Sequence, residues 1–207
     1  MLDFSDSFDP GLSAIPQYAE WKKFAEKYGG KLDPSNLLLF IFINGSISIP
    51  LQARTLLFKN QPTWIRARRM TVVSLPYAPL SDFLFAIEKK GSIAKLGRWL
   101  NLPLQRPDSS VHLVSNFSSS SILDKSVQCI SNDAQKCAEL FSDSKLLEVM
   151  EQAPDLLPSI DTSSYKKKQT FDLRLEIPDI LANQEKLEFI HNYFLVLMTV
   201  MQEHGLC

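Results

Sequence analysis

Residues 177–205 read IPDILANQEKLEFIHNYFLVLMTVMQEHG, and this stretch predicts a long C-terminal helix on which the rest of the chain packs. Pro178 and Asp179 predict its start, since both residue types favour the first helical turn, and Gly205 predicts its end. The segment YFLVLMTVM is apolar almost all round, yet it is shorter than the roughly 20 residues that span a bilayer. We therefore expect a helix that its own domain buries on two sides. The predicted inner face, at steps of three and four, is Leu187, Ile190, Phe194, Leu197 and Met201.

The composition is that of an ordinary globular chain. It has 207 residues, of which 45% are hydrophobic and 22% are charged, and this length suffices for a real core. The start, MLDFSDSFDPG, lacks the positive-then-apolar pattern of a secretory signal. The three cysteines, Cys129, Cys137 and Cys207, have no metal-like spacing. We therefore expect buried, reduced thiols in a soluble cytoplasmic protein.

The region between residues 37 and 88 predicts an antiparallel meander of about four strands. The run LLLFIFI at 37–43 is typical of a strand buried on both faces. Asn44 and Gly45 suit a two-residue hairpin turn, and a strand then follows from 46 toward 58. Pro50 argues for an edge or a bulge in that strand. A turn at 60–62 precedes predicted strands at 64–75 and 83–88.

The remaining segments alternate between short strands and capped helices. A helix is expected from an N-cap at Ser13, with Pro16 in its first turn, to the glycines at 29–30, and short strands are expected at 111–115, 127–130 and 157–162. The segment Ser131, Asn132 and Asp133 predicts one helix cap, and Asp143 or Ser142 predicts the next. The segment QTFDLRLEI at 169–177 alternates strictly and predicts a half-exposed strand.

Together these elements predict an α+β fold, in which an antiparallel sheet packs against a long C-terminal helix and several short helices. The sheet would combine the N-terminal meander with the later short strands. We expect a flexible N-terminal arm at residues 1–12 and a single domain at residues 13–207. A boundary between two sub-layers is expected near residues 103–110.

Charge is distributed unevenly along the chain. The net charge is −1 overall, but it is −2 for residues 1–51, +8 for residues 52–106 and −7 for residues 107–207. A basic middle can form an anion-binding surface, or it can pair with the acidic ends within one fold. The candidate contact residues for an anion or a partner are Arg66, Arg68, Arg69, Lys89, Lys90, Arg98 and Trp64.

Residue patterns typical of catalysis are absent from the sequence. His112, His191 and His204 have no second histidine, cysteine or carboxylate at metal-ligand spacing. The serine run at 118–121 has no nearby base to activate it. We therefore expect no catalytic residues, no metal and no cofactor, and we interpret the protein as a non-enzyme.

Several short motifs resemble those of a bacterial family of unassigned function. They are FLFAIE at 83–88, LGRWL at 96–100, Asp108 leading into VHLVSN, SNDAQKCAELF at 131–141 and KLLEVM at 145–150. The paired late strands, the final helix, and Trp21, Phe24, Ala25 and Gly29 fit the same pattern. The resemblance implies an α+β domain in a bacterial protein, and it supplies no active site.

Three functions remain open at this stage. The first is an interaction or scaffold domain in the cytoplasm, with a protein partner or a second copy of the chain. The second is a binder of an apolar or amphipathic small molecule between the sheet and the C-terminal helix. The third is a weak anion or nucleic-acid contact through the basic middle segment, although the acidic pI of about 6.3 makes a nucleic acid the less favoured partner.

Overall fold

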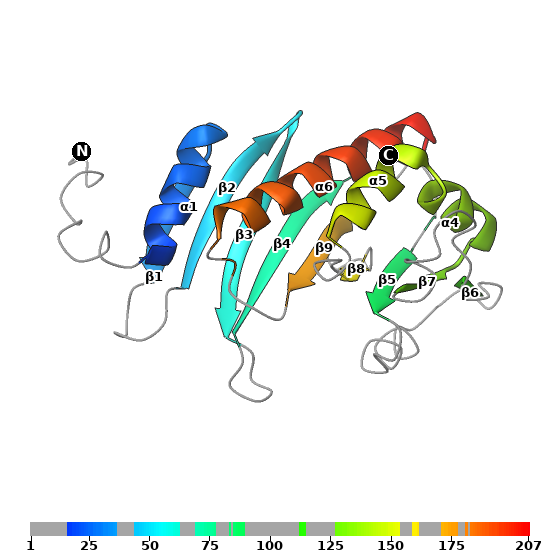
Figure 1. Cartoon of the computed structure of the whole chain (residues 1–207), viewed down its shortest axis with the longest axis horizontal. Coiled ribbons are helices and arrows are strands. Elements are labelled where there is room, and N and C mark those ends of the chain that lie inside the picture. The colour runs from blue at the N-terminus through cyan, green and yellow to red at the C-terminus, as the bar shows by residue number, and fades with distance from the viewer. Residues whose placement is uncertain are drawn as a thin grey trace. The chain divides into compact units, whose positions relative to one another are not determined.

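The protein has an α+β fold, in which an antiparallel sheet packs against helices that include a long C-terminal one (Figure 1). The computed structural model describes residues 16–36, 44–62, 69–77, 83, 85–89, 112–114, 127–153, 159–161, 171–177, 181 and 183–207. The elements are α1 (Pro16–Lys27), β1 (Lys31–Asn36), β2 (Asn44–Leu51), β3 (Arg54–Pro62), β4 (Arg69–Tyr77), β5 (Phe85–Lys89), β6 (His112–Val114), β7 (Val127–Ser131), α4 (Ala134–Phe141), α5 (Ser144–Gln152), β8 (Ser159–Asp161), β9 (Phe171–Ile177) and α6 (Gln184–Glu203).

The chain divides into two compact units, and β4 and α6 contribute residues to both. Unit 1 comprises residues 1–73 and 178–191, and unit 2 comprises residues 74–177 and 192–207. The predicted arm at 1–12 and the predicted boundary at 103–110 lie outside the described residues. The single domain expected over residues 13–207 stays a prediction.

In unit 1, β1, β2, β3 and β4 are hydrogen-bonded in chain order and so form an N-terminal meander. Its strands differ from the predicted ones, because β1 was not predicted and β2 and β3 were predicted as one strand. The β1–β2 and β2–β3 pairs are antiparallel. Ile47 is paired with Phe58 and Ile49 with Leu56, and all four side chains are buried. Period-two alternation therefore sends one face of this hairpin into the core, which fixes its register.

The turns of the meander differ from those predicted. Asn44 and Gly45 lie within β2, and Asn44 is paired with Asn36, so the predicted hairpin turn there is wrong. The β2–β3 turn falls instead at Gln52 and Ala53, where Gln52 has a φ of 54°. Asparagine and glycine signal a turn only through their tolerance of positive φ. Here Gln52 adopts that conformation without either residue type.

The hairpin of β2 and β3 also bears on two further expectations, the turn at residues 60–62 and the edge or bulge at Pro50. Residues 60–62, predicted as a turn, belong to β3. In a two-residue hairpin the closing pair, Leu51 and Arg54, exchanges hydrogen bonds, so the next pair, Pro50 and Thr55, does not. The nitrogen of Pro50 therefore faces away from β3 and needs no partner there. The strand predicted at 37–43 and residues 64–68 of the one predicted at 64–75 lie outside the described residues.

The core of unit 1 forms around Phe24 of α1, whose side chain is fully buried. Its ring lies 5.3 Å from the ring of Phe58 on β3 and 6.1 Å from that of His191 on α6. Leu181 joins the elements through its backbone: its carbonyl accepts a hydrogen bond from Trp21 Nε1, and its amide donates to Thr71 Oγ1 at 3.0 Å. These two buried bonds hold the chain that leads into α6 in a non-helical path.

The long helix α6 begins later than predicted, at Gln184. Asn183 Oδ1 accepts hydrogen bonds from the amides of Glu185 at 2.8 Å and Lys186 at 3.3 Å, which is the action of an N-cap residue. Leu181 and Asn183 are not helical, so the predicted start at Pro178 and Asp179 is wrong. The predicted inner face is confirmed, because all five of its side chains are buried.

Glycine ends both α1 and α6 in the same way. Gly29 has a φ of 64° and Gly205 a φ of 65°. After α6, Gly205 N donates to Gln202 O and Leu206 N donates to Met201 O, which is the bonding pattern of a Schellman motif. Gly29 and Gly30 repeat this pattern after α1. The predicted ends of both helices are therefore confirmed.

In unit 2, the hydrogen-bonded order is β9, β8, β5, β7 and β6. The β5–β7, β5–β8, β6–β7 and β8–β9 pairs are all antiparallel. The predicted place of β5 as the fourth strand of the meander is wrong, because its partners β7 and β8 come much later in the chain. The later elements match their predictions. In particular, Leu173, Leu175 and Ile177 of β9 are buried, whereas Arg174 and Glu176 are half-buried.

Candidate interaction surface

Most of the candidate contact residues chosen from sequence lie outside the described part of the chain. These are Trp64, Arg66, Arg68, Lys90 and Arg98. Arg69 is the first residue of β4 and Lys89 is the last residue of β5, and only their strand positions are described. A basic contact surface therefore stays a prediction, and we build the candidate site from unit 2.

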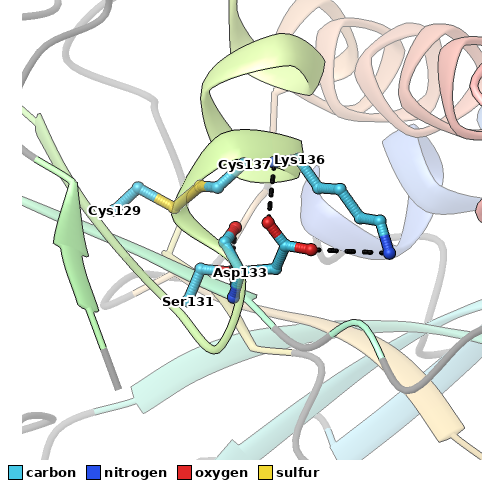
Figure 2. Close-up of a disulfide and its surroundings, with 5 residues drawn as sticks. All are labelled: Cys129, Ser131, Asp133, Lys136 and Cys137. Carbon is cyan, nitrogen blue, oxygen red and sulfur yellow. Dashed lines mark hydrogen bonds and ion pairs between the residues drawn. A yellow bond between two sulfur atoms is a disulfide. The ribbon is translucent and has the colours of Figure 1, made fainter. Parts of the chain in front are cut away.

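A disulfide joins Cys129 on β7 to Cys137 on α4 (Figure 2). Both residues are fully buried. The expectation of reduced thiols is therefore wrong for this pair, and Cys207 lies outside the bond. A spacing of eight residues carries no signal by itself. The two cysteines meet because the strand turns directly into the helix, and this turn could not be inferred from cysteine count.

The turn between β7 and α4 is held by a compact set of hydrogen bonds. Ser131 Oγ donates to Asp133 O and accepts from Asp133 N, both at 3.0 Å. Asp133 Oδ1 accepts from the Lys136 amide at 3.0 Å, and its Oδ2 lies 3.4 Å from Lys136 Nζ. The hydrogen bond from the Lys136 backbone lowers the pKa of Asp133, so this cap is charged at neutral pH. The cap predicted within residues 131–133 is confirmed, and Asp133 is the capping residue.

The start of α5 is fixed in a related way. Asp143 Oδ1 accepts from the Lys145 amide at 2.9 Å, which confirms Asp143 as the cap. Lys145 Nζ lies 2.6 Å and 2.7 Å from the two carboxylate oxygens of Glu203 at the end of α6. The hydrogen bond to Glu203 raises the pKa of Lys145. His204 Nε2 also lies 3.7 Å from Asp143 Oδ2. These contacts tie the first turn of α5 to the end of α6.

The helices α4 and α5 carry three exposed acids, Glu139, Glu148 and Glu151, which define what we call the acidic face. Residues 133–153 contain five acids and two lysines, a net charge of −3. Both lysines are engaged, Lys136 with Asp133 and Lys145 with Glu203. Among the described residues, no ion-pair partner faces Glu148 or Glu151. Because the positive charges are bound internally, the face presents negative charge outward.

Unit 1 has a second polar cluster, between α1 and the first half of α6. Lys27 Nζ donates to Glu188 Oε1 at 2.7 Å, and Gln184 Nε2 donates to the same oxygen at 3.0 Å. The rings of Tyr28 and His191 lie 4.1 Å apart, and His191 is only 8% exposed. Burial lowers the pKa of His191, although the nearby Glu188 carboxylate opposes this shift. A neutral, stacked imidazole here acts as a packing residue.

The described residues hold no metal-ligand constellation and no helix able to cross a bilayer. Within these ranges, no three His, Cys, Asp or Glu side chains gather closely enough to bind a metal ion. None of the described helices combines the length and apolarity that a membrane span needs.

Comparison of the chain with protein-family models, with curated proteins and with solved structures gives no match. The resemblance to a bacterial family therefore stays a prediction.

Proposed function

We propose that the protein is a non-enzymatic interaction domain that binds a basic surface of a partner protein through the acidic face of α4 and α5. The observation that carries this proposal is that both lysines on these helices are held in internal ion pairs, while Glu148 and Glu151 are exposed. Charge of one sign on a rigid surface attracts a complementary partner and orients its approach.

The rigidity of the face supports the proposal. The inner sides of α4 and α5 are anchored by buried apolar residues, among them Leu140, Phe141, Leu146 and Met150. Phe141 packs edge-on against Phe85 of β5, with ring centroids 5.4 Å apart. A face that is ordered before binding loses little conformational entropy when a partner docks. The acidic side chains can therefore act as a fixed template.

The other functions expected from the sequence draw on different parts of the chain. The anion contact depends on basic residues most of which lie outside the described ranges. The small-molecule site depends on a space between sheet and helix, and no described feature defines one. Location in a bacterial cytoplasm also stays a prediction, because the disulfide removes the argument from reduced cysteines.

A charge-reversal experiment tests the proposal. The double variant E148K/E151K should lose its partners in a pull-down at low salt, and wild-type binding should weaken as salt rises toward about 1 M, where screening acts over roughly 3 Å. The matched control, E26K/E185K, changes two exposed acids of unit 1 by the same charge. Only proteins that the first variant loses and the control retains support the proposal.

The same variants distinguish an internal role of the acidic face. If the face pairs with the basic residues of its own chain, E148K/E151K will lower the melting temperature and leave the recovered proteins unchanged. That outcome contradicts the proposal. Equal binding by wild type and both variants contradicts it as well.

A further inference from the structure

We propose that Cys129 and Cys137 form a reversible redox pair that fixes α4 to the sheet when oxidised and releases its first turn when reduced. This inference stands on the β7–α4 junction alone and is independent of the proposed binding function. It needs a thiol–disulfide partner of the glutathione class as the co-reactant.

The backbones of the two cysteines lie far apart for a disulfide. The Cα atoms of Cys129 and Cys137 lie 7.4 Å apart, whereas most disulfides join Cα atoms about 4.4–6.8 Å apart. Beyond about 7 Å, a disulfide requires backbone movement to close. One of the two segments therefore shifts between the reduced and the oxidised form, so the two forms differ in local structure.

Of the two segments that the bond joins, β7 is the more firmly held. β7 lies between β5 and β6, where Cys129 is paired with Ile87 on one side and Val114 on the other. A strand hydrogen-bonded on both sides cannot shift without breaking two ladders. The helix α4 has eight residues, and its first turn depends on the Asp133 cap. We therefore assign the adjustment to α4.

The bond can form again after reduction. The cysteines are only eight positions apart in the sequence, and the segment between them includes the whole capping turn. After reduction the two thiols remain close together, because closing so short a loop costs little chain entropy. Both sulfurs lie in a buried setting, where reduced cysteines pack as small apolar side chains. The reduced form therefore stays folded and can close again.

The chemistry balances through thiol–disulfide exchange. During oxidation, the thiolate of one cysteine attacks oxidised glutathione, forms a mixed disulfide and displaces one glutathione thiolate. The second cysteine, as its thiolate, attacks the protein sulfur of that mixed disulfide and displaces the second glutathione thiolate. The protein pair loses two electrons and two protons, and one glutathione disulfide becomes two glutathione thiols.

The test is a redox titration of the full chain in glutathione buffers, with thiol alkylation and mass spectrometry as the readout. The C207S variant is used so that only the pair is counted. The oxidised fraction should change gradually with the ratio of oxidised to reduced glutathione. A pair that stays fully reduced, or fully oxidised, at every ratio overturns the proposal.

A second measurement tests the structural part. Amide hydrogen exchange at residues 134–141 should become several-fold faster in the reduced form, while exchange at β7 stays unchanged. Because the sulfurs are buried, reduction also requires opening, and D133A should speed reduction roughly five-fold by removing a cap. The matched variant D143A, which removes the α5 cap, should not. Equal exchange in both redox forms, or equal reduction rates for the two cap variants, overturns the assignment to α4.

Discussion

The two units of this protein build their sheets in different ways. Unit 1 joins strands that follow one another in the chain, and a two-residue turn links β2 to β3. Unit 2 places β5 beside β7 and β8, which come tens of residues later. The helix of unit 1 packs through aromatic side chains, whereas α4 of unit 2 is also tied by a disulfide and a charged cap. Pairing of strands that are close in sequence closes short loops and costs little chain entropy. Pairing of strands that are far apart in sequence closes long loops, and this larger entropy cost comes before their contacts form.

Removal of α6 should have the largest effect on both units. A chain truncated after Asn183 loses at least eight buried side chains, among them Leu187, Phe194 and Met201. At about 1.5–3 kcal/mol for each buried apolar side chain, the loss exceeds the roughly 5–15 kcal/mol that stabilises a typical domain. We expect an unfolded or aggregated product by circular dichroism and gel filtration. A soluble, cooperatively folded truncation would show that α6 is a docking arm.

Truncation of a single core side chain in each unit should have the second-largest effect on stability. F24A in unit 1 and F141A in unit 2 each remove a fully buried ring, at an expected cost of about 3–5 kcal/mol. Because α6 supplies buried residues to both units, we expect each variant to unfold in one transition, monitored by urea titration with two optical probes. Two separate transitions would show independent domains and contradict the single domain predicted from sequence.

The elements that the sequence predicted well are those set by local chemistry. Asp133, Asp143, Gly29 and Gly205 cap helices through their own side chains or their own φ, and the strict alternation in β9 follows from one buried face. The start of α6 was missed because two tertiary hydrogen bonds to Leu181 hold its approach in a non-helical path.

The strand pairing of β5, the cysteine pairing and the candidate site were harder to infer from the sequence. The place of β5 and the Cys129–Cys137 bond depend on which segments meet in space, and period-two alternation contains no such information. The acidic face was visible only as an excess of acids after residue 107. Its definition required knowing that Lys136 and Lys145 are already paired. Most of the basic residues chosen from sequence remain outside the described ranges, and only the strand positions of Arg69 and Lys89 are described.

A pair of glycine variants tests how closely the end of α1 packs on β2 in unit 1. A Cβ at Gly30 would lie 2.6 Å from the Ser48 carbonyl oxygen on β2, which is backbone and cannot rotate away. G30A should therefore destabilise by about 1–3 kcal/mol through overpacking. G29A meets open space and should cost only about 1 kcal/mol for its positive φ. Urea unfolding of both variants checks the order, and a larger loss for G29A would contradict the close packing of α1 on β2.

The smallest effect concerns pH and again separates the two units. Burial holds the pKa of His191 in the folded protein below its ordinary value of 6.5, against the opposing carboxylate of Glu188 and with the help of Lys27. Above pH 6.5 the imidazole is neutral in both states and adds no pH dependence. As pH falls below 6.5, the unfolded chain binds a proton before the folded chain does, so the free energy of unfolding falls until the folded pKa is passed. H191Q should flatten this slope, whereas N192Q, which alters an exposed, uncharged residue of unit 2, should retain it. Urea titrations between about pH 8 and pH 5 measure the difference. An unchanged slope in H191Q would mean that the Tyr28–His191 stack admits the charged imidazole, and the packing role assigned to His191 would then be wrong.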